Sequence, residues 1–295
     1  MKIDGVFAGG GLKAYAYIGV LDSLEEHGYQ LERVAGTSAG AIIAGFIAAG
    51  YTRVEIRTLL EELNVQSFLD APKFVQVFPF TKWFFLYKQL GLYYGNRFEK
   101  WLYEKLAAKN VYTFSDIRKD AYKIVVSDIS KSKLIVLPDD LEEVYGVCPK
   151  TFPIARAIRM SAGYPYFFMP KQMRDIQGNK SLIVDGGLLS NFPLWIFDAD
   201  RNKRKRPIIG VKLTSEHVHT KPRKITNALD MLQALFSTMI VAHDNRYISK
   251  SKQHHIIFIP TSHVDTLNFS LTDQEKQNLI QKGYKKTNAF LTHWP

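Results

Sequence analysis

The stretch Val34-Ala35-Gly36-Thr37-Ser38-Ala39-Gly40 constrains the fold of this chain more than any other. An apolar run that favours a strand leads into it, and the apolar residues 41–49 that follow favour a helix. Gly-x-Ser-x-Gly between a strand and a helix is typical of a nucleophile elbow, a strained turn that lifts a serine hydroxyl clear of the backbone. Gly36 and Gly40 fit such a turn, because positions on either side of the serine come too close for a Cβ atom. The pattern therefore predicts that Ser38 is a nucleophile, with an ordinary tight turn as the alternative.

A glycine-rich turn near the N-terminus has two possible functions. Residues 3–8 favour a buried strand, and Gly9-Gly10-Gly11-Leu12-Lys13-Ala14 joins it to a helix with apolar residues at helical spacing. Backbone N–H groups in such a turn can form an oxyanion hole, together with the N–H of Ala39 at the start of the elbow helix. The turn also meets a relaxed dinucleotide fingerprint, which requires an acidic residue at the end of the second strand. Because the elbow stands at that position and Glu32 precedes the strand, the sequence favours the oxyanion hole.

A nucleophilic serine needs a base, and the chain offers two kinds. A conventional triad would use one of the eight histidines, among which His217 and His263 are conceivable. Asp185 is better placed, because it follows the short apolar strand 182–184 and precedes Gly186 and Gly187, so that its carboxylate can lie at the same end of the sheet as Ser38. The ordinary pKa of aspartate is about 3.9, and desolvation beside the serine would raise it toward the working range of a base.

Strands that alternate with helices along the whole chain indicate one α/β layered domain with a largely parallel sheet. Thr52 with Glu55, and Thr272 with Glu275, predict capping boxes at the start of two helices. Asn96 is a plausible N-cap for a helix over residues 97–108. A long helix is expected over residues 226–250, with these side chains facing inward: Leu229, Leu232, Leu235, Phe236, Met239 and Ile240.

Composition narrows the cellular setting and the partners. The net charge of +11 favours anionic partners, and the sharpest basic cluster, residues 201–206, is interpreted as a solvated turn, with a membrane-contacting patch as the alternative. No signature supports nucleic-acid binding. The single cysteine, Cys148, excludes an intrachain disulfide, and the N-terminus lacks the apolar run of a signal peptide, so we expect a cytoplasmic protein.

Residues 67–95 form an aromatic-rich stretch with interleaved lysines and poor periodicity. Two interpretations remain open for this stretch. Its aromatic side chains can be buried as a cover for the core, or they can form an apolar lid or interfacial surface over a lipid-like substrate site.

Three motifs, in order, resemble those of bacterial patatin-like phospholipases: Gly9-Gly10-Gly11-Leu12-Lys13, Gly36-Thr37-Ser38-Ala39-Gly40 and Asp185-Gly186-Gly187. The segments 161–165 and Asn191-Phe192-Pro193 also resemble blocks of that family. The resemblance covers residues 2–215, with residues 216–295 completing a single three-layer domain over residues 1–295, whose central sheet is flanked by helices. Two departures are Ala14, where the family usually has glycine, and Lys13, where arginine is common.

The resemblance implies a lipid acyl hydrolase that works with a catalytic dyad and no histidine. Ser38 would be the nucleophile, Asp185 its sole base, and the amides of Gly9, Gly10, Gly11 and Leu12 would form the oxyanion hole. The substrate would be a glycerolipid acyl ester, and no metal or cofactor would enter the reaction. A peripheral contact with an anionic membrane surface would suit both the substrate and the net charge, and no nucleic acid is expected as a partner.

Overall fold

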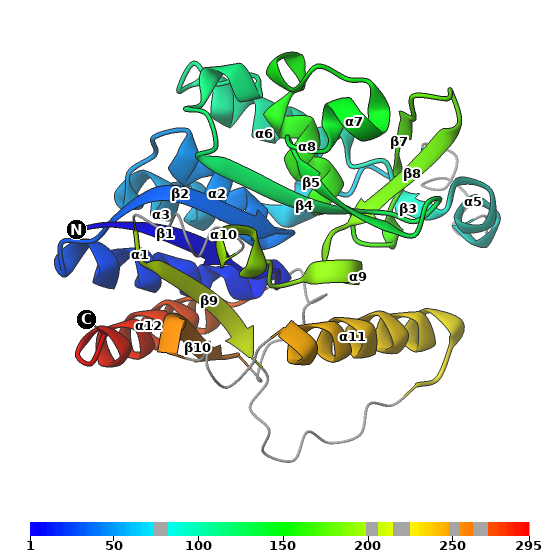
Figure 1. The fold of residues 1–295 in the computed structure, drawn as a ribbon. Helices are drawn as coiled ribbons and strands as arrows, with labels where there is room; N and C mark the ends of the chain where they lie inside the picture. The colour runs from blue at the N-terminus through cyan, green and yellow to red at the C-terminus, as the bar shows by residue number, and fades with distance from the viewer. Residues whose placement is uncertain (73–81, 199–205, 215–224, 248–253, 262–270, 295) are drawn as a thin grey trace.

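The computed structural model describes residues 1–72, 82–198, 206–214, 225–247, 254–261 and 271–294 (Figure 1). Most of the basic cluster (201–205), the aromatic residues between 73 and 81, and His217, His219 and His263 lie outside the described residues. None of the described helices is long and apolar enough to cross a membrane.

A central sheet of eight strands organises the described chain (Figure 1). Five strands run parallel in the order β10-β9-β1-β2-β4, which confirms a largely parallel sheet, and three strands, β5, β8 and β7, extend it with antiparallel pairing. The strand bounds are β1 Lys2–Phe7, β2 Gln30–Thr37, β4 Tyr122–Asp128, β5 Lys133–Leu137, β7 Lys171–Arg174, β8 Lys180–Asp185, β9 Ile208–Thr214 and β10 Ile256–Pro260. Two short strands, β3 Gly91–Tyr93 and β6 Tyr166–Phe168, form a separate ladder.

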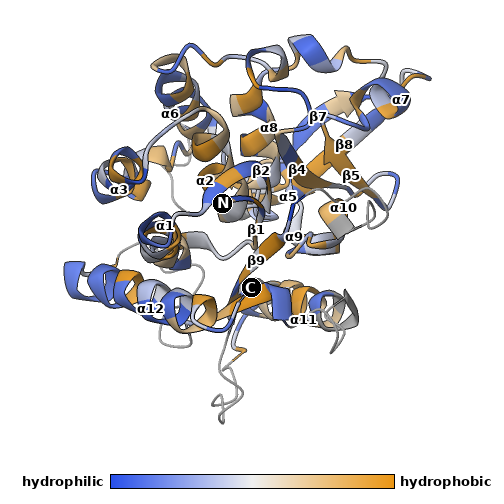
Figure 2. Cartoon of the chain, turned by 60° about the vertical axis from the view of Figure 1, so that its left-hand side comes forward, coloured by the Kyte–Doolittle hydropathy of each residue, from blue (hydrophilic) through white to orange (hydrophobic). Residues whose placement is uncertain are grey.

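Helices flank the sheet on both faces, as the alternation of strands and helices predicts. The larger core cluster lies under α1 (Ala16–Glu26), α2 (Ala39–Ala48), α6 (Asn96–Ala107), α8 (Ile154–Ser161) and α12 (Asp273–Leu291). A smaller cluster on the other face includes Val6, Ala35, Phe192 and Ile208. The remaining helices are α3 Arg53–Glu61, α5 Lys82–Gln89, α7 Leu141–Tyr145, α9 Gly187–Ser190, α10 Trp195–Asp198 and α11 Ala228–Tyr247. Apolar residues gather in the strands and on the helix sides that face them (Figure 2).

The C-terminal part of the chain completes the same sheet. Strand β10 pairs in parallel with β9, and α12 packs along α1. Residues on both sides of position 215 therefore share one sheet and one core. On the sheet face that carries the smaller cluster, the buried carboxylate of Asp4 pairs with Arg33 at 2.6 Å and with Arg206 at 3.0 Å. Arg206, the last residue of the basic cluster, therefore belongs to an internal ion pair.

The N-termini of three helices show which short sequence patterns are sufficient to predict a helix cap. The capping boxes predicted at Thr52 and Thr272 are both present. The predicted N-cap of α6 is wrong by one residue, because Gly95 occupies that position with a positive φ of 68°. The carboxylate of Asp70 accepts hydrogen bonds from the N–H groups of Gly95, Asn96 and Arg97, so a residue distant in sequence caps this helix.

The expected orientation of α11 is wrong at two positions. Phe236 is buried, as expected, whereas Leu235 and Met239 are exposed on the outer side of the helix. Between residues 231 and 242 the apolar side chains of this helix are not confined to one side, so its periodicity could not tell the inner face from the outer one. The aromatic stretch is similarly divided, because Phe68 is buried against Phe98 and Trp101 while Tyr87 is 80% exposed.

Candidate active site

Ser38 and Asp185 meet because two strands approach each other end to end along one edge of β4. Strand β2 pairs in parallel with the first half of β4, where Thr37 lies opposite Val125. Strand β8 runs antiparallel along the second half, where Asp185 lies opposite Val126. Strand β5 occupies the other edge of β4. The residues that end β2 and β8 are therefore brought together, and Ser38 Oγ donates a hydrogen bond to Asp185 Oδ2 at 2.7 Å.

The backbone of Ser38 is strained in the way that a nucleophile elbow requires. Its φ of 54° and ψ of −124° are rare for a residue with a side chain, and such strain amounts to about 1–3 kcal/mol. A Cβ added to Gly36 would lie 2.4 Å from the carbonyl carbon of Gly40. A Cβ added to Gly40 would lie 2.2 Å from the carbonyl oxygen of Phe7. The two glycines therefore allow α2 to begin directly against the ends of β1 and β2.

The end of α8 holds both Ser38 and Asp185. Ser161 Oγ accepts a hydrogen bond from the N–H of Ser38 at 2.9 Å and donates one to the carbonyl of Val125 at 2.6 Å. The Ser161 carbonyl accepts from the N–H of Gly186 at 3.4 Å, and the Gly163 carbonyl accepts from the N–H of Asp185 at 3.0 Å. This short segment thus fixes the elbow and the aspartate turn relative to each other. Its likeness to a family block was the only sequence signal for this role.

The environment of Asp185 suits a base. The residue is only 2% exposed, and its second oxygen, Oδ1, accepts a hydrogen bond from the N–H of Gly187 at 2.7 Å. Burial raises the pKa of this carboxyl group to about 7, although the hydrogen bonds from Gly187 and Ser38 oppose the rise. Near neutral pH the group therefore exchanges its proton readily, unlike an exposed aspartate.

The glycine-rich turn passes directly beside Ser38. A Cβ added to Gly9 would lie 3.1 Å from Ser38 Cβ and 2.3 Å from Asn191 Oδ1, so a side chain here would displace the Asn191 amide and crowd Ser38. The Gly9 N–H donates to the Asn191 carbonyl at 3.0 Å, which occupies one of the amides expected in the oxyanion hole. Gly11 has a positive φ of 58° and begins the single 3-10 turn Gly11–Tyr15, in which Ala14 is buried.

Several amides at this turn and at the elbow have no backbone partner among the described residues. Among the described residues, no backbone hydrogen bond uses the N–H of Gly10 or Gly11. Ala39 is the first residue of α2, and the first N–H groups of a helix have no partner within the helix. These amides can therefore serve an anion that forms beside Ser38 Oγ.

A polar network that the sequence argument missed lies beneath the glycine turn. The buried carboxylate of Asp244, on α11, pairs with Lys212 Nζ at 2.9 Å and accepts a hydrogen bond from Asn191 Nδ2 at 3.5 Å. Asn191 thus connects Gly9 to α11. Only Asn191 carried a signal in the sequence, as part of a family-like block, because an aspartate in an apolar helix and a lysine in a strand have no pattern of their own.

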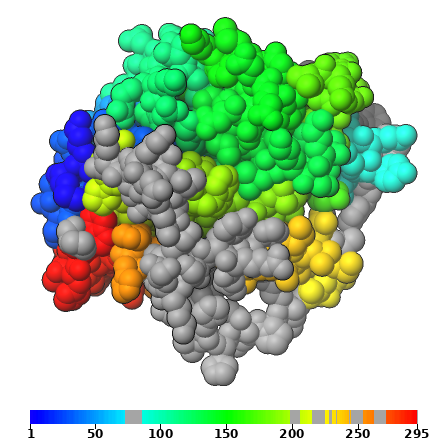
Figure 3. All heavy atoms as spheres, in the orientation of Figure 1, coloured from blue at the N-terminus to red at the C-terminus, as the bar shows by residue number. Residues whose placement is uncertain are grey.

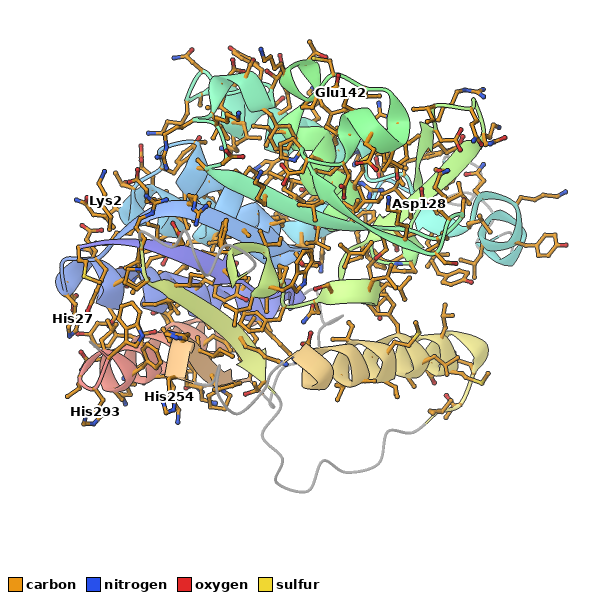
Figure 4. The ribbon with its side chains drawn as sticks, viewed as in Figure 1. Lys2, His27, Asp128, Glu142, His254 and His293 are labelled. Atoms are coloured by element: carbon orange, nitrogen blue, oxygen red, sulfur yellow. The ribbon has the colours of Figure 1, made fainter. Side chains whose placement is uncertain are left out.

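Three of the histidines whose side chains the structure describes lie away from this site. His27, His254 and His293 are located around α12, β10 and the end of α1 (Figure 4). Within the described part of the chain, no histidine forms a hydrogen bond with Ser38 or Asp185, and no group of three or more His, Cys, Asp or Glu side chains is arranged to hold a metal ion.

Comparison with known proteins gives a consistent result. The family model described as patatin-like phospholipase matches residues 5–198. The chain is 45% identical to the Bacillus subtilis protein YqhO over 294 residues, covering 100% of this chain and 99% of that protein. Over a shorter segment of 59 residues, 20% of this chain and 4% of the relative, it is 34% identical to lysophospholipase NTE1 of Candida albicans.

Solved structures agree in fold. VipD from Legionella pneumophila matches with a TM-score of 0.61 at 18% identity, over 99% of this chain and 67% of that chain. The type III effector ExoU of Pseudomonas aeruginosa matches with a TM-score of 0.52 at 16% identity, over 99% of this chain and 53% of that chain. At these identities the likeness concerns the fold alone.

Proposed function

Since the chain belongs to the patatin-like phospholipase family, a family of lipid acyl hydrolases, we propose that it hydrolyses acyl esters of glycerolipids with Ser38 as nucleophile and Asp185 as base. The observation that carries this proposal is the 2.7 Å hydrogen bond from the hydroxyl of a strained serine to a buried carboxylate with a pKa of about 7. A base whose pKa lies near the working pH is the most effective proton acceptor, because it is both available and strong enough.

The proposed reaction has two halves. Asp185 accepts the Ser38 proton while Ser38 Oγ attacks the ester carbonyl, and the resulting tetrahedral intermediate expels the alcohol, which takes the proton from Asp185. Water then attacks the acyl-enzyme while Asp185 accepts one of its protons. Collapse of the second intermediate releases the fatty acid and returns the proton to Ser38 Oγ.

The proposed oxyanion hole uses the amides of Gly10, Gly11 and Ala39, with Leu12 as the next amide along the turn. Gly9 is left out as a donor, because its N–H is bonded to Asn191, and it contributes by leaving room for Ser38. Ala14 lies inside the following 3-10 turn and is buried there, so the fold accommodates its methyl group. Loss of one donor from such a hole typically lowers the rate about 100- to 1,000-fold.

Two alternatives are less well supported. In a conventional triad, the acid would orient a histidine, whereas both oxygens of Asp185 are already engaged, by Ser38 and by Gly187. A dinucleotide-binding protein would need an acidic side chain at the end of β2 and an unobstructed glycine turn. The elbow ends β2, and Asn191 occupies the Gly9 amide.

A fluorophosphonate probe and a panel of phospholipid, lysophospholipid and neutral esters would test the proposal. We expect the wild type to be labelled and to hydrolyse at least one lipid class, and Ser38→Ala to lose both properties. The matched control is Ser23→Ala, which removes a buried serine hydroxyl that has no hydrogen-bond partner among the described residues and lies on α1.

Equal labelling of Ser38→Ala would disprove the role of Ser38. Full activity of Asp185→Asn together with inactivity of a histidine variant would replace the dyad by a triad. Tight retention of a dinucleotide without any ester hydrolysis would favour a binding protein instead. We also propose that the protein works in the cytoplasm. Its single cysteine, Cys148, is free, as is usual in a reducing compartment.

A further inference from the structure

Between residues 231 and 242, helix α11 carries apolar side chains on both of its sides, although only one side packs against other described residues. Residues 231–242 contain no charged side chain. Met231, Leu235, Met239 and Val241 are exposed by 56, 53, 41 and 54%. Met231, Leu235 and Met239 follow one another at intervals of four residues and therefore share one side of the helix. We call these three residues the outer face of α11.

The inner side of α11 packs on the elements that hold the dyad. Phe236 makes an edge contact with Tyr164, with ring centroids 4.6 Å apart. Tyr164 directly follows Gly163, whose carbonyl holds the Asp185 amide. Ile240 Cδ1 lies 3.6 Å from the position of a Cβ on Gly187, at the start of α9. The helix therefore lies along the aspartate turn, as its position under α9 shows (Figure 1).

The end of α11 is fixed to the glycine turn as well. Asp244 is held by Lys212 and by Asn191, which in turn accepts the Gly9 N–H. One helix thus contacts the segment that bears the proposed base and is linked through Asn191 to the segment that bears the proposed oxyanion amides. Since a helix with its side chains is about 10 Å across, whatever covers the outer face lies within roughly one helix diameter of the site.

The outer face lies at the surface of the protein, where α11 forms part of the molecular outline in the space-filling view (Figure 3). A contiguous row of exposed apolar side chains on a soluble surface marks an interaction site. A helical segment with apolar side chains on both of its sides is ordinarily buried on both, which residues 231–242 are not. The outer face therefore requires an apolar partner.

We propose that the outer face of α11 docks on the surface of a lipid bilayer that carries anionic headgroups, and so places the site against its substrate. The identity of this partner rests on the proposed function: a lipid aggregate is the one occupant that both covers an apolar face and supplies the molecules to be hydrolysed. The net charge of +11 complements anionic headgroups, which attract basic proteins to a membrane surface. The uncharged outer face then enters the boundary between headgroups and acyl chains.

The test compares two triple variants, both in a Ser38→Ala background so that the vesicles are not consumed. The first carries Met231→Gln, Leu235→Gln and Met239→Gln, which keep helix-forming residues but make the outer face polar. The matched control carries Val54→Gln, Ile129→Gln and Ile176→Gln, at three exposed apolar positions on other elements. Binding is measured by flotation with vesicles of phosphatidylcholine, with and without phosphatidylglycerol, and thermal unfolding confirms that each variant is folded.

We expect at least tenfold weaker vesicle binding for the α11 variant and wild-type binding for the control variant. In the Ser38-containing proteins, the ratio of the rate on vesicles to the rate on a soluble short-chain ester should fall by a similar factor. Equal binding of the α11 variant, or an equal loss in both variants, would overturn the proposal. A dimer that the α11 substitutions convert to a monomer would show instead that a second copy covers this face.

These outcomes can be separated from failure of the proposed function. Vesicle binding is measured without turnover, so its loss or retention does not depend on which residue is the nucleophile. If Ser38→Ala hydrolysed lipids as fast as the wild type, the dyad would be excluded whatever the flotation result.

Discussion

At the scale of single residues, Asp185 combines a cost in stability with a chemical use. A carboxylate 2% exposed and without a cationic partner among the described residues is disfavoured in its charged form, which is why its pKa rises to about 7. The same rise suits it to the role of base that we propose for it at neutral pH. The charge state of one side chain should therefore govern both activity and stability, in opposite directions.

Activity should depend on pH through Asp185. The proposed reaction needs the carboxylate form, so kcat/KM should fall about tenfold for each pH unit below about 7 and level off above it. A pH–rate profile with a soluble ester between pH 5 and 9 would measure this. A flat profile down to pH 5 would contradict Asp185 as the base.

Stability should change with pH in the opposite sense. Because the folded-state pKa of Asp185 lies above the ordinary value of 3.8, its contribution is intact below pH 4 and is lost as the pH rises to about 7. The difference of about three pKa units corresponds to at most roughly 4 kcal/mol. Asp185→Asn, which stays neutral, should therefore gain stability relative to the wild type as the pH rises from 4 to 8, in urea unfolding.

Asp175 provides a control, because its contribution to stability should change with pH in the opposite direction. The hydrogen bond from Lys131 is the main reason that the pKa of its carboxyl group falls to about 2. Asp175→Asn should consequently be less stable than the wild type at neutral pH, with the difference shrinking as the pH falls through 4 toward 2. If both variants changed with pH in the same direction, the assignment of Asp185 as the raised group would be wrong.

Ser161 should act as a positioning residue. Ser161→Ala removes the acceptor of the Ser38 N–H and should lower kcat roughly tenfold to a hundredfold with little change in KM, because misplacement of a reacting group mainly affects the chemical step. Steady-state kinetics on a soluble ester would measure the split. Ser161→Thr, which keeps the hydroxyl, should recover part of the rate.

The matched control for Ser161 is Ser181→Ala, at a buried serine on β8 whose hydroxyl has no hydrogen-bond partner among the described residues. We expect its kcat to stay near the wild-type value. A Ser161→Ala enzyme with a normal kcat would show that the elbow keeps its geometry without this hydrogen bond.

At the scale of elements, the sequence predicted the parts of the site better than their arrangement. The strand, glycine turn and helix around Ser38 follow from local chemistry, since any side chain at Gly36 or Gly40 would clash with neighbouring backbone atoms. Asp185 was expected at the same end of a parallel sheet as Ser38, whereas the two meet because β8 runs antiparallel toward β2 along β4. Strand direction depends on pairing between distant segments, which no local pattern encodes.

Helices show the same limit. Asp70 caps α6 from a distant position in the sequence, so no local capping pattern could predict this cap. The outer side of α11 is as apolar as its inner side, so helical periodicity could not predict which side is buried. The capping boxes at Thr52 and Thr272 were predictable because both partners lie within four residues.

Helices α1 and α12 cross through a reciprocal glycine contact. A Cβ added to Gly283 would lie 1.9 Å from the Ala16 carbonyl oxygen, and one added to Gly19 would lie 2.0 Å from the Ile280 carbonyl oxygen. Gly283→Ala should therefore force the two backbones apart and destabilise the protein by about 1–3 kcal/mol or more, despite the better helix propensity of alanine.

Thermal or urea unfolding would measure this effect. Asn278→Ala, at an exposed position of the same helix, is the matched control and should change stability by about 0.5 kcal/mol or less. A Gly283→Ala protein as stable as the control would mean that the helices can separate without loss of packing.

At the scale of the whole molecule, the sheet is assembled from segments far apart in the chain. Strand β1 lies between β2, about thirty residues later, and β9, about two hundred residues later. The α1–α12 crossing likewise joins the first helix to the last. Both halves of the described chain must therefore be present before the core beneath the glycine turn is complete.

The end-to-end meeting of β2 and β8 also determines when the protein can first become active during its synthesis. The two residues of the proposed dyad are 147 positions apart. At a translation rate of about 5–20 residues per second, roughly 7–30 s separate their appearance on a ribosome. Until β8 has emerged and paired, the serine on its strained turn has no base beside it. If the proposed dyad is correct, a nascent or prematurely terminated chain would therefore carry Ser38 without its base and would be inactive.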